Sequence, residues 1–226
     1  MDVAIVSRLW RVDWHLSVLL GLLLLCVFIL YPMSGSGPLV GIVLQALLSL
    51  ILISGAVLIA RTRTGLALVS LLAVGIAAIG WIRLASPANW LSVLGLSTWI
   101  VFLGMLTAAI LIRVFEEGSI NVHRIQGAVA AYLLLGVIWS GCYRVVIAFD
   151  SGAFSPAAIG DEGTLMSRLV YFSFATLTTV GYGDVTAVDT AARSLAMLEA
   201  LTGQLFPAVL IARLVSMEVS HRKKQC

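Results

Sequence analysis

Long apolar runs separated by short polar or basic turns dominate the chain. A helix that crosses a bilayer needs about 20 mostly apolar residues. Six runs come close to that length, and we predict them as transmembrane helices: Leu16–Met33, Leu39–Ala60, Gly65–Ile82, Trp90–Ile112, Ile125–Tyr143 and Ser194–Ala212. A further apolar run, Leu165–Thr178, is too short to cross and return, so we expect a helix that re-enters the face it left. The pattern therefore predicts an all-α membrane protein.

The composition agrees with that class. Of the 226 residues, 61% are hydrophobic and 11% are charged, whereas soluble domains are nearer half apolar and a quarter charged. The net charge of +3 is small and the basic residues form no patch interleaved with aromatics, so we expect no nucleic acid partner. The scattered Cys26, Cys142 and Cys226 fit neither a disulfide framework nor a metal site.

The basic residues predict the orientation of these helices. With the N-terminus in the cytoplasm, ten arginine and lysine residues lie inside and four lie outside. Short cytoplasmic loops of membrane proteins carry such an excess of positive charge. We therefore expect both termini in the cytoplasm, and the loop after the re-entrant helix dips in from the outer face.

That loop carries the chemistry of the chain. Its residues are Thr178, Thr179, Val180, Gly181, Tyr182, Gly183 and Asp184. Backbone carbonyls can all face one axis only where some residues take conformations that L-residues avoid, and Gly181 and Gly183 allow this. Asp184 follows at the outer mouth, where a carboxylate can hydrogen-bond behind the loop and raise the local cation concentration.

The loop resembles the selectivity filter of the potassium channels, and the resemblance covers about Ile125 to Val215. It implies that K⁺ ions replace their hydration shell with the carbonyls of Thr179, Val180, Gly181 and Tyr182, with the Thr179 hydroxyl below and no other cofactor. One filter per chain then requires a homotetramer. The resemblance further implies a prokaryotic six-span subunit in a bacterial inner membrane.

The re-entrant helix is expected to support this loop as a pore helix. Thr164 is a candidate N-cap, and the C-terminal end of the dipole would face a cation below the filter. Tyr171, Phe172 and Phe174 are expected to form an aromatic cuff behind the filter. By analogy with the superfamily Tyr171 would bond Asp184; ordinary aromatic packing at the membrane interface is the alternative.

The last span is expected to line an inner cavity. Gly203 follows Gly183 by twenty residues, a spacing that resembles the gating-hinge glycine of the family, and Pro207 comes one turn later. Together they predict a bend, while close helix packing is the other role open to Gly203. Gln204 is expected to face the watery cavity or a neighbouring helix, and Ile211 to narrow the inner mouth.

Glu199 is an acid inside a predicted span. A carboxylate at that depth is costly unless it is neutral or paired, so we expect a functional role. One role is a hydrogen bond behind the filter or the pore helix, and the other is a protonation site that tunes gating.

The first four spans lack the arginines of voltage sensors. Trp90–Ile112 has no basic residue and Arg113 stands alone at its end, so we expect weak voltage dependence. The expected division is 1–113 for a four-helix domain, 114–124 for a cytoplasmic interfacial linker, 125–217 for the pore domain and 218–226 for a basic tail. We expect no soluble regulatory domain, and membrane lipids as partners.

Three functions remain open at this point. The favoured one is a passive potassium-selective channel, and the second is a weakly selective cation channel on the same fold. The third is a membrane enzyme or transporter whose loop mimics the motif. An enzyme is not expected, because the sequence offers no nucleophile–base pair and no zinc-protease motif.

Overall fold

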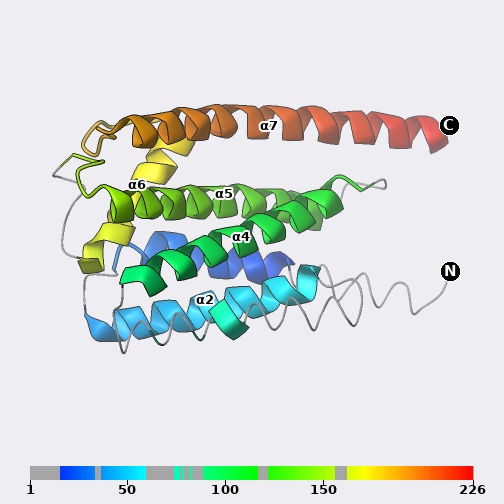
Figure 1. Ribbon diagram of the computed structural model, residues 1–226. Helices are drawn as coiled ribbons and strands as arrows, with labels where there is room; N and C mark the ends of the chain where they lie inside the picture. The colour runs from blue at the N-terminus through cyan, green and yellow to red at the C-terminus, as the bar shows by residue number, and fades with distance from the viewer. Residues whose placement is uncertain are drawn as a thin grey trace.

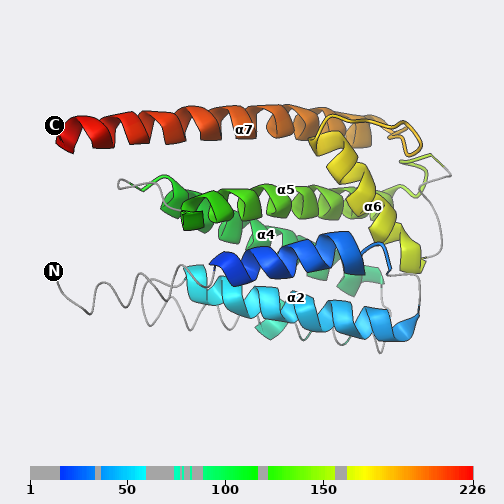
Figure 2. The ribbon, with the colours of Figure 1, turned by 180° about the vertical axis from the view of Figure 1, so that it is seen from behind.

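The computed structural model describes residues 16–33, 37–59, 74–76, 78, 82, 89–116, 122–155 and 162–225. These residues are mainly helical, and an isolated β-bridge joins Phe154 to Ala187. The long helices run side by side, whereas the shorter α6 slants across them (Figures 1 and 2). Most of the predicted third span, Gly65–Ile82, lies outside the described residues.

The helices match the apolar runs, and α4, α5 and α7 extend beyond them at both ends. Their bounds are Leu16–Leu30, which closes with the π-helical turn η1 (Cys26–Leu30), then α2 (Pro38–Ile59), α4 (Asn89–Val114), α5 (Val122–Phe149), α6 (Glu162–Leu177) and α7 (Thr190–Gln225). In the described residues, three segments are long and apolar enough to cross a membrane: Gly95–Val114, Val122–Phe149 and Thr190–Met217. Leu16–Leu30 and Leu39–Leu52 are shorter apolar helices.

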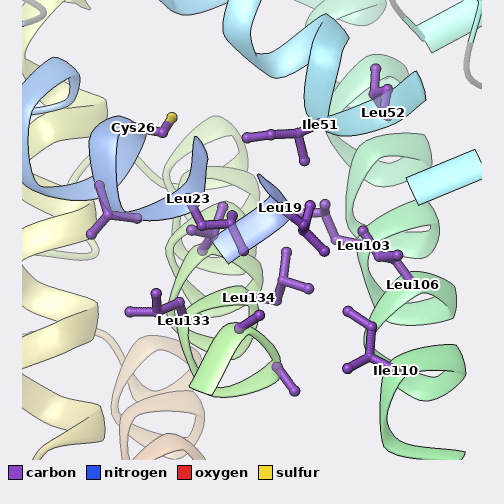
Figure 3. Packing of buried hydrophobic residues seen from close by; sticks show 14 of the residues in the cluster. Leu19, Leu23, Cys26, Ile51, Leu52, Leu103, Leu106, Ile110, Leu133 and Leu134 are labelled. Carbon is purple, nitrogen blue, oxygen red and sulfur yellow. The ribbon is translucent and has the colours of Figure 1, made fainter. Parts of the chain in front are cut away.

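One continuous apolar core joins the N-terminal helices to the later ones. Leu19 and Leu23 of the first helix, Leu103 and Leu106 of α4, and Leu134 of α5 point toward one another in Figure 3, and all five are buried. The core therefore extends across residue 113, so the described parts of the first, second and fourth predicted spans pack with the fifth.

The length and position of α6 are those expected of a re-entrant helix. Its 16 residues span about 24 Å, short of a bilayer core of about 30 Å. The backbone of Leu177, where α6 ends, lies against Gly203, and Gly203 is roughly 20 Å along α7 from Thr190. The helix thus stops near the middle of the apolar part of α7.

The segments on either side of α6 return to the same end of the molecule. The turn after α5 pairs with the segment before α7 through Ser155 N–H to Thr186 O at 2.9 Å and Val188 N–H to Ala153 O at 2.8 Å. The end of α5 and the start of α7 are therefore held together, with α6 and its following loop between them. This is the topology that the apolar pattern predicted for the last third of the chain.

Candidate functional site

The backbone of the loop after α6 alternates in handedness. Thr179, Gly181 and Gly183 have φ values of 60°, 55° and 81°, and Val180 and Tyr182 between them do not share that positive φ. Successive peptide groups of such a chain turn to the same side, whereas those of a β-strand alternate. A positive φ is unusual for a β-branched residue, so Thr179 must be held in place by its surroundings.

The end of α6 supplies part of that support. Its last four carbonyls have no partner within the helix itself, yet each accepts a hydrogen bond. Phe174 O accepts from Thr178 N–H, Thr176 O from Thr179 N–H, and Leu177 O from the Tyr132 hydroxyl. Ala175 O accepts from both Val180 N–H and Gly181 N–H, at 2.9 and 3.1 Å. The first half of the loop is therefore fastened to α6 by main-chain bonds.

Side chains hold the outer half of the loop. The rings of Tyr171 and Tyr182 stack with centroids 6.1 Å apart and planes 6° apart. The Tyr171 hydroxyl also hydrogen-bonds Asp184, which raises the pKa of that hydroxyl. The carboxylate in turn accepts from Val185 N–H at 3.0 Å. The contact that the resemblance suggested between Tyr171 and Asp184 is thus present.

A side chain from α7 reaches the loop from below. Gln204 Nε2 donates to Thr179 Oγ1 at 2.9 Å, and both side chains are exposed in the single chain. This bond fixes the rotamer of Thr179 and leaves the second lone pair of its hydroxyl oxygen free for another donor or a cation. Gln204 therefore contacts the loop itself, and its exposure to a watery cavity stays a prediction.

Gly203 allows α6 and α7 to touch backbone to backbone. A Cβ atom at Gly203 would lie 1.8 Å from the carbonyl oxygen of Leu177 and 2.7 Å from its carbonyl carbon. The helix α7 continues through Gly203 and Pro207 from Thr190 to Gln225. The structure therefore gives Gly203 a packing role, one of the two alternatives that the sequence left open.

Glu199 is fully buried one turn before Gly203. It accepts a short hydrogen bond from the Tyr143 hydroxyl of α5 and lies 2.5 Å from Ser173 Oγ of α6. Ser173 Oγ is also 2.7 Å from the carbonyl oxygen of Gly136 in α5. The acid thus lies where α5, α6 and α7 meet.

Three expectations for α6 need correction or refinement. Thr164 is the third residue of the helix rather than its N-cap, because α6 already begins at Glu162. Phe172 points away from the loop and packs edge-on against Tyr143 and Phe154, with ring centroids 5.1 and 5.3 Å away. Phe174 contacts α5 at Gly136. Of the three expected aromatics, Tyr171 and Phe174 therefore lie on the side of the loop, whereas Phe172 does not.

Comparison with known proteins agrees with this geometry. A family model described as an ion channel matches residues 129–220. Protein LctB of Bacillus caldotenax is 31% identical over 113 residues, which cover 49% of this chain and 84% of the relative. Protein LctB of Geobacillus stearothermophilus is 38% identical over 86 residues, 37% of this chain and 62% of the relative. No solved structure matches. The chain belongs to the potassium-channel superfamily.

The helix α7 corresponds to the span that the sequence predicted to line an inner cavity. Its apolar side chains Leu205, Val209, Ile211 and Val215 are each more than half exposed in the single chain. Pro207 is half-buried within the helix. Such an apolar face must be covered by lipid or by other chains, and the narrowing of an inner mouth by Ile211 stays a prediction.

The first helix makes a contact that sequence reasoning missed. A cavity of about 570 Å³ lies between Phe28 and Tyr31 of that helix and Val180 and Tyr182 of the filter loop. Phe28 packs against Phe174, with ring centroids 6.4 Å apart. The first helix and the turn after it therefore touch α6 and line the space beside the loop.

Sequence reasoning also missed the partners of Glu199. Tyr143 and Ser173 are polar residues in an apolar span and in the re-entrant helix, and each is buried beside the acid. A buried acid needs hydrogen-bond donors, so the hydroxyl side chains of neighbouring predicted helices were the signal available. The close packing of Phe174 against Gly136 gave no such signal, because it depends on which faces of α5 and α6 meet.

Proposed function

We propose that four copies of this chain form a potassium-selective channel that conducts K⁺ passively along their common axis. The observation that carries the proposal is the alternating handedness at Thr179, Gly181 and Gly183. It supports a row of carbonyls, from Thr179 to Tyr182, that face one side of the loop. Four such rows around one axis replace the hydration shell of a K⁺ ion.

The surroundings of the loop support the same function. Such a carbonyl row is stable only if the opposite side of the loop is anchored. Ala175 O anchors its lower half and the stacked Tyr171 anchors its upper half. The Thr179 hydroxyl, oriented by Gln204, adds an oxygen at the entrance to the row. Non-helical backbone at membrane depth is tolerated where it lines a water-filled path.

Fourfold assembly follows from the number of loops. Each chain supplies a single loop of this type, and a ring of carbonyls needs four. The exposed apolar face of α7 would then line the cavity or meet the neighbouring subunits. Contacts between that face and neighbouring subunits would form only in the assembled protein, which favours the tetramer as the functional unit.

The finer topology belongs to the same proposal. We infer six transmembrane helices per subunit, with both termini in the cytoplasm of a bacterial cell and lipids around the first four helices. We also infer a four-helix domain that ends at residue 113, an interfacial linker to residue 124, a pore domain to residue 217 and a basic tail from residue 218. Opening would not depend steeply on voltage, because α4 carries no basic residue before Arg113.

Selective stabilisation by K⁺ tests this function without a flux measurement. An ion that binds only the folded tetramer raises its free energy of unfolding by about 2.7 kcal/mol at a hundred times its dissociation constant. We therefore expect the midpoint of thermal dissociation of the purified protein to rise with K⁺ and far less with Na⁺. A midpoint that neither salt raises would contradict a potassium filter, and an equal rise in both salts would favour a weakly selective channel.

A further inference from the structure

Three oxygen–oxygen contacts connect α5, α7 and α6. They join the Tyr143 hydroxyl to Glu199 Oε2, Glu199 Oε1 to Ser173 Oγ, and Ser173 Oγ to Gly136 O. Tyr143 and Gly136 are seven residues apart on α5, so the path leaves that helix and returns to it two turns away. Glu199 and Ser173 are both fully buried.

Counting protons shows that an ionised Glu199 cannot satisfy this path. Tyr143 and Ser173 have one hydroxyl proton each, which leaves three contacts with two protons. If Ser173 donates to Glu199, its lone pairs face the Gly136 carbonyl at 2.7 Å. If it donates to Gly136, they face a carboxylate oxygen at 2.5 Å. Either arrangement places two acceptor oxygens in repulsive contact.

We propose that Glu199 is a neutral carboxylic acid whose proton completes a directed chain of hydrogen bonds and so positions the pore helix. Tyr143 donates to Oε2, the Oε1 hydroxyl donates to Ser173, and Ser173 donates to Gly136 O. Each proton has one acceptor and each contact has one proton. We call the four residues Tyr143, Glu199, Ser173 and Gly136 the acid brace.

The surroundings of Glu199 favour the neutral form. Its two direct partners are neutral hydroxyls, and neither offers the positive charge that stabilises a buried carboxylate. The titratable groups that act on it come from α5, with Tyr143 in contact and Tyr132 and Cys142 interacting at longer range. From α6 the group in contact is Ser173. A negative charge here would lack compensation from all of these groups.

The acid brace acts on the filter through α6. Ser173 lies on the helix that ends at Leu177, and the filter loop begins at the next residue. Loss of the Glu199 proton would leave one contact of the brace without a hydrogen and free α6 from either α5 or α7. Glu199 is therefore a positioning residue, and its effect on conduction rests on the proposed channel function. The protonation itself does not depend on that function.

Infrared spectroscopy tests the protonation directly in the purified full-length protein in lipid. We expect the difference spectrum between wild type and Glu199→Gln at neutral pH to contain the carbonyl band of a protonated acid. Ser173→Ala should shift that band, because the acid then loses its acceptor. A difference spectrum with carboxylate bands alone would overturn the proposal, and so would a protonated-acid band that Ser173→Ala leaves unmoved.

A pH profile of K⁺ flux in liposomes tests the positioning role. The amide of Glu199→Gln can donate to Ser173 and accept from Tyr143, so the K⁺ flux of this variant should stay constant as the pH rises. The wild-type flux should instead fall as Glu199 loses its proton. Glu199→Met cannot donate, and its flux should fall roughly tenfold, as expected for a buried polar group without a partner. The same dependence of K⁺ flux on alkaline pH in wild type and Glu199→Gln would overturn the positioning role.

The two measurements separate this inference from the proposed function. Absence of flux in every variant together with the protonated-acid band would contradict the channel and leave the neutral acid standing. Flux that is normal in wild type and in Glu199→Met would overturn the brace and leave the channel standing.

Discussion

Replacing Gly203 by alanine separates the two roles that a glycine can have in the middle of α7. In a helix without a close neighbour, Gly→Ala stabilises by about 1 kcal/mol, because alanine loses less backbone entropy and has a higher helix propensity. A hinge glycine would therefore give a more stable protein with altered gating. A packing glycine gives the opposite sign.

The structure supplies the magnitude for the packing role. The new Cβ would lie 1.8 Å from Leu177 O, and real Cβ contacts are essentially never below 3.0 Å, so the backbones must separate by at least about 1.2 Å, the difference of the two values. Overpacking of this kind costs typically 1–3 kcal/mol. The upper end applies here, because the obstructing atom belongs to the backbone of α6. The same displacement moves the helix end that carries the filter.

Thermal dissociation of the proposed tetramer and K⁺ flux in liposomes measure both consequences. The matched control is Gly104→Ala in α4, where nothing lies within 4 Å of the new Cβ, so stability should be unchanged or slightly higher. We expect Gly203→Ala to lower the midpoint and the flux while the control retains both. A Gly203→Ala protein as stable as the control, with only its gating altered, would refute the packing argument.

Three further predictions follow from the contacts of the filter and α4. Gln204→Leu removes the hydrogen bond to Thr179 and should reduce the stabilisation by K⁺ by about 1 kcal/mol. The control Thr202→Ala should leave that stabilisation unchanged, because Thr202 hydrogen-bonds within its own helix, and equal effects of the two variants would contradict the contact. Tyr171→Phe keeps the ring and loses the bond to Asp184, so the K⁺ flux should fall while the tetramer persists, and unchanged flux would show that the ring alone supports the loop. Conductance–voltage curves from single-channel or planar-bilayer recordings should be shallow, because α4 lacks a series of basic residues and moving one charge across the field gives only about 2.3 kcal/mol per 100 mV. A steep curve with several gating charges would contradict this prediction.

Local rules explain why much of the fold was predictable. Apolar runs of bilayer length predict helices wherever they occur, and the helices α4, α5 and α7 overlap the predicted spans. The loop could be located because its backbone conformation requires residues such as Gly181 and Gly183, and these glycines are visible in a single sequence. The family match over residues 129–220 then confirmed the potassium-channel resemblance of that part of the chain.

Contacts between helices could not be predicted, because they depend on which faces meet. The hinge and packing roles of Gly203 have the same sequence signal, and only the approach of Leu177 distinguishes them. The direction of Phe172 likewise depends on Tyr143 of another helix. Side-chain polarity predicted that Glu199 needs partners, yet their identity required the relative placement of α5 and α6.

The flux of K⁺ against Na⁺ through the reconstituted protein tests the central claim most directly. Liposomes that contain the full-length chain should pass K⁺ and exclude Na⁺, and Ba²⁺, a divalent ion close to K⁺ in size, should block the K⁺ flux. Protein-free liposomes provide the baseline. Comparable K⁺ and Na⁺ fluxes would contradict a selective carbonyl filter, and no flux of either ion above the baseline would contradict conduction by this loop.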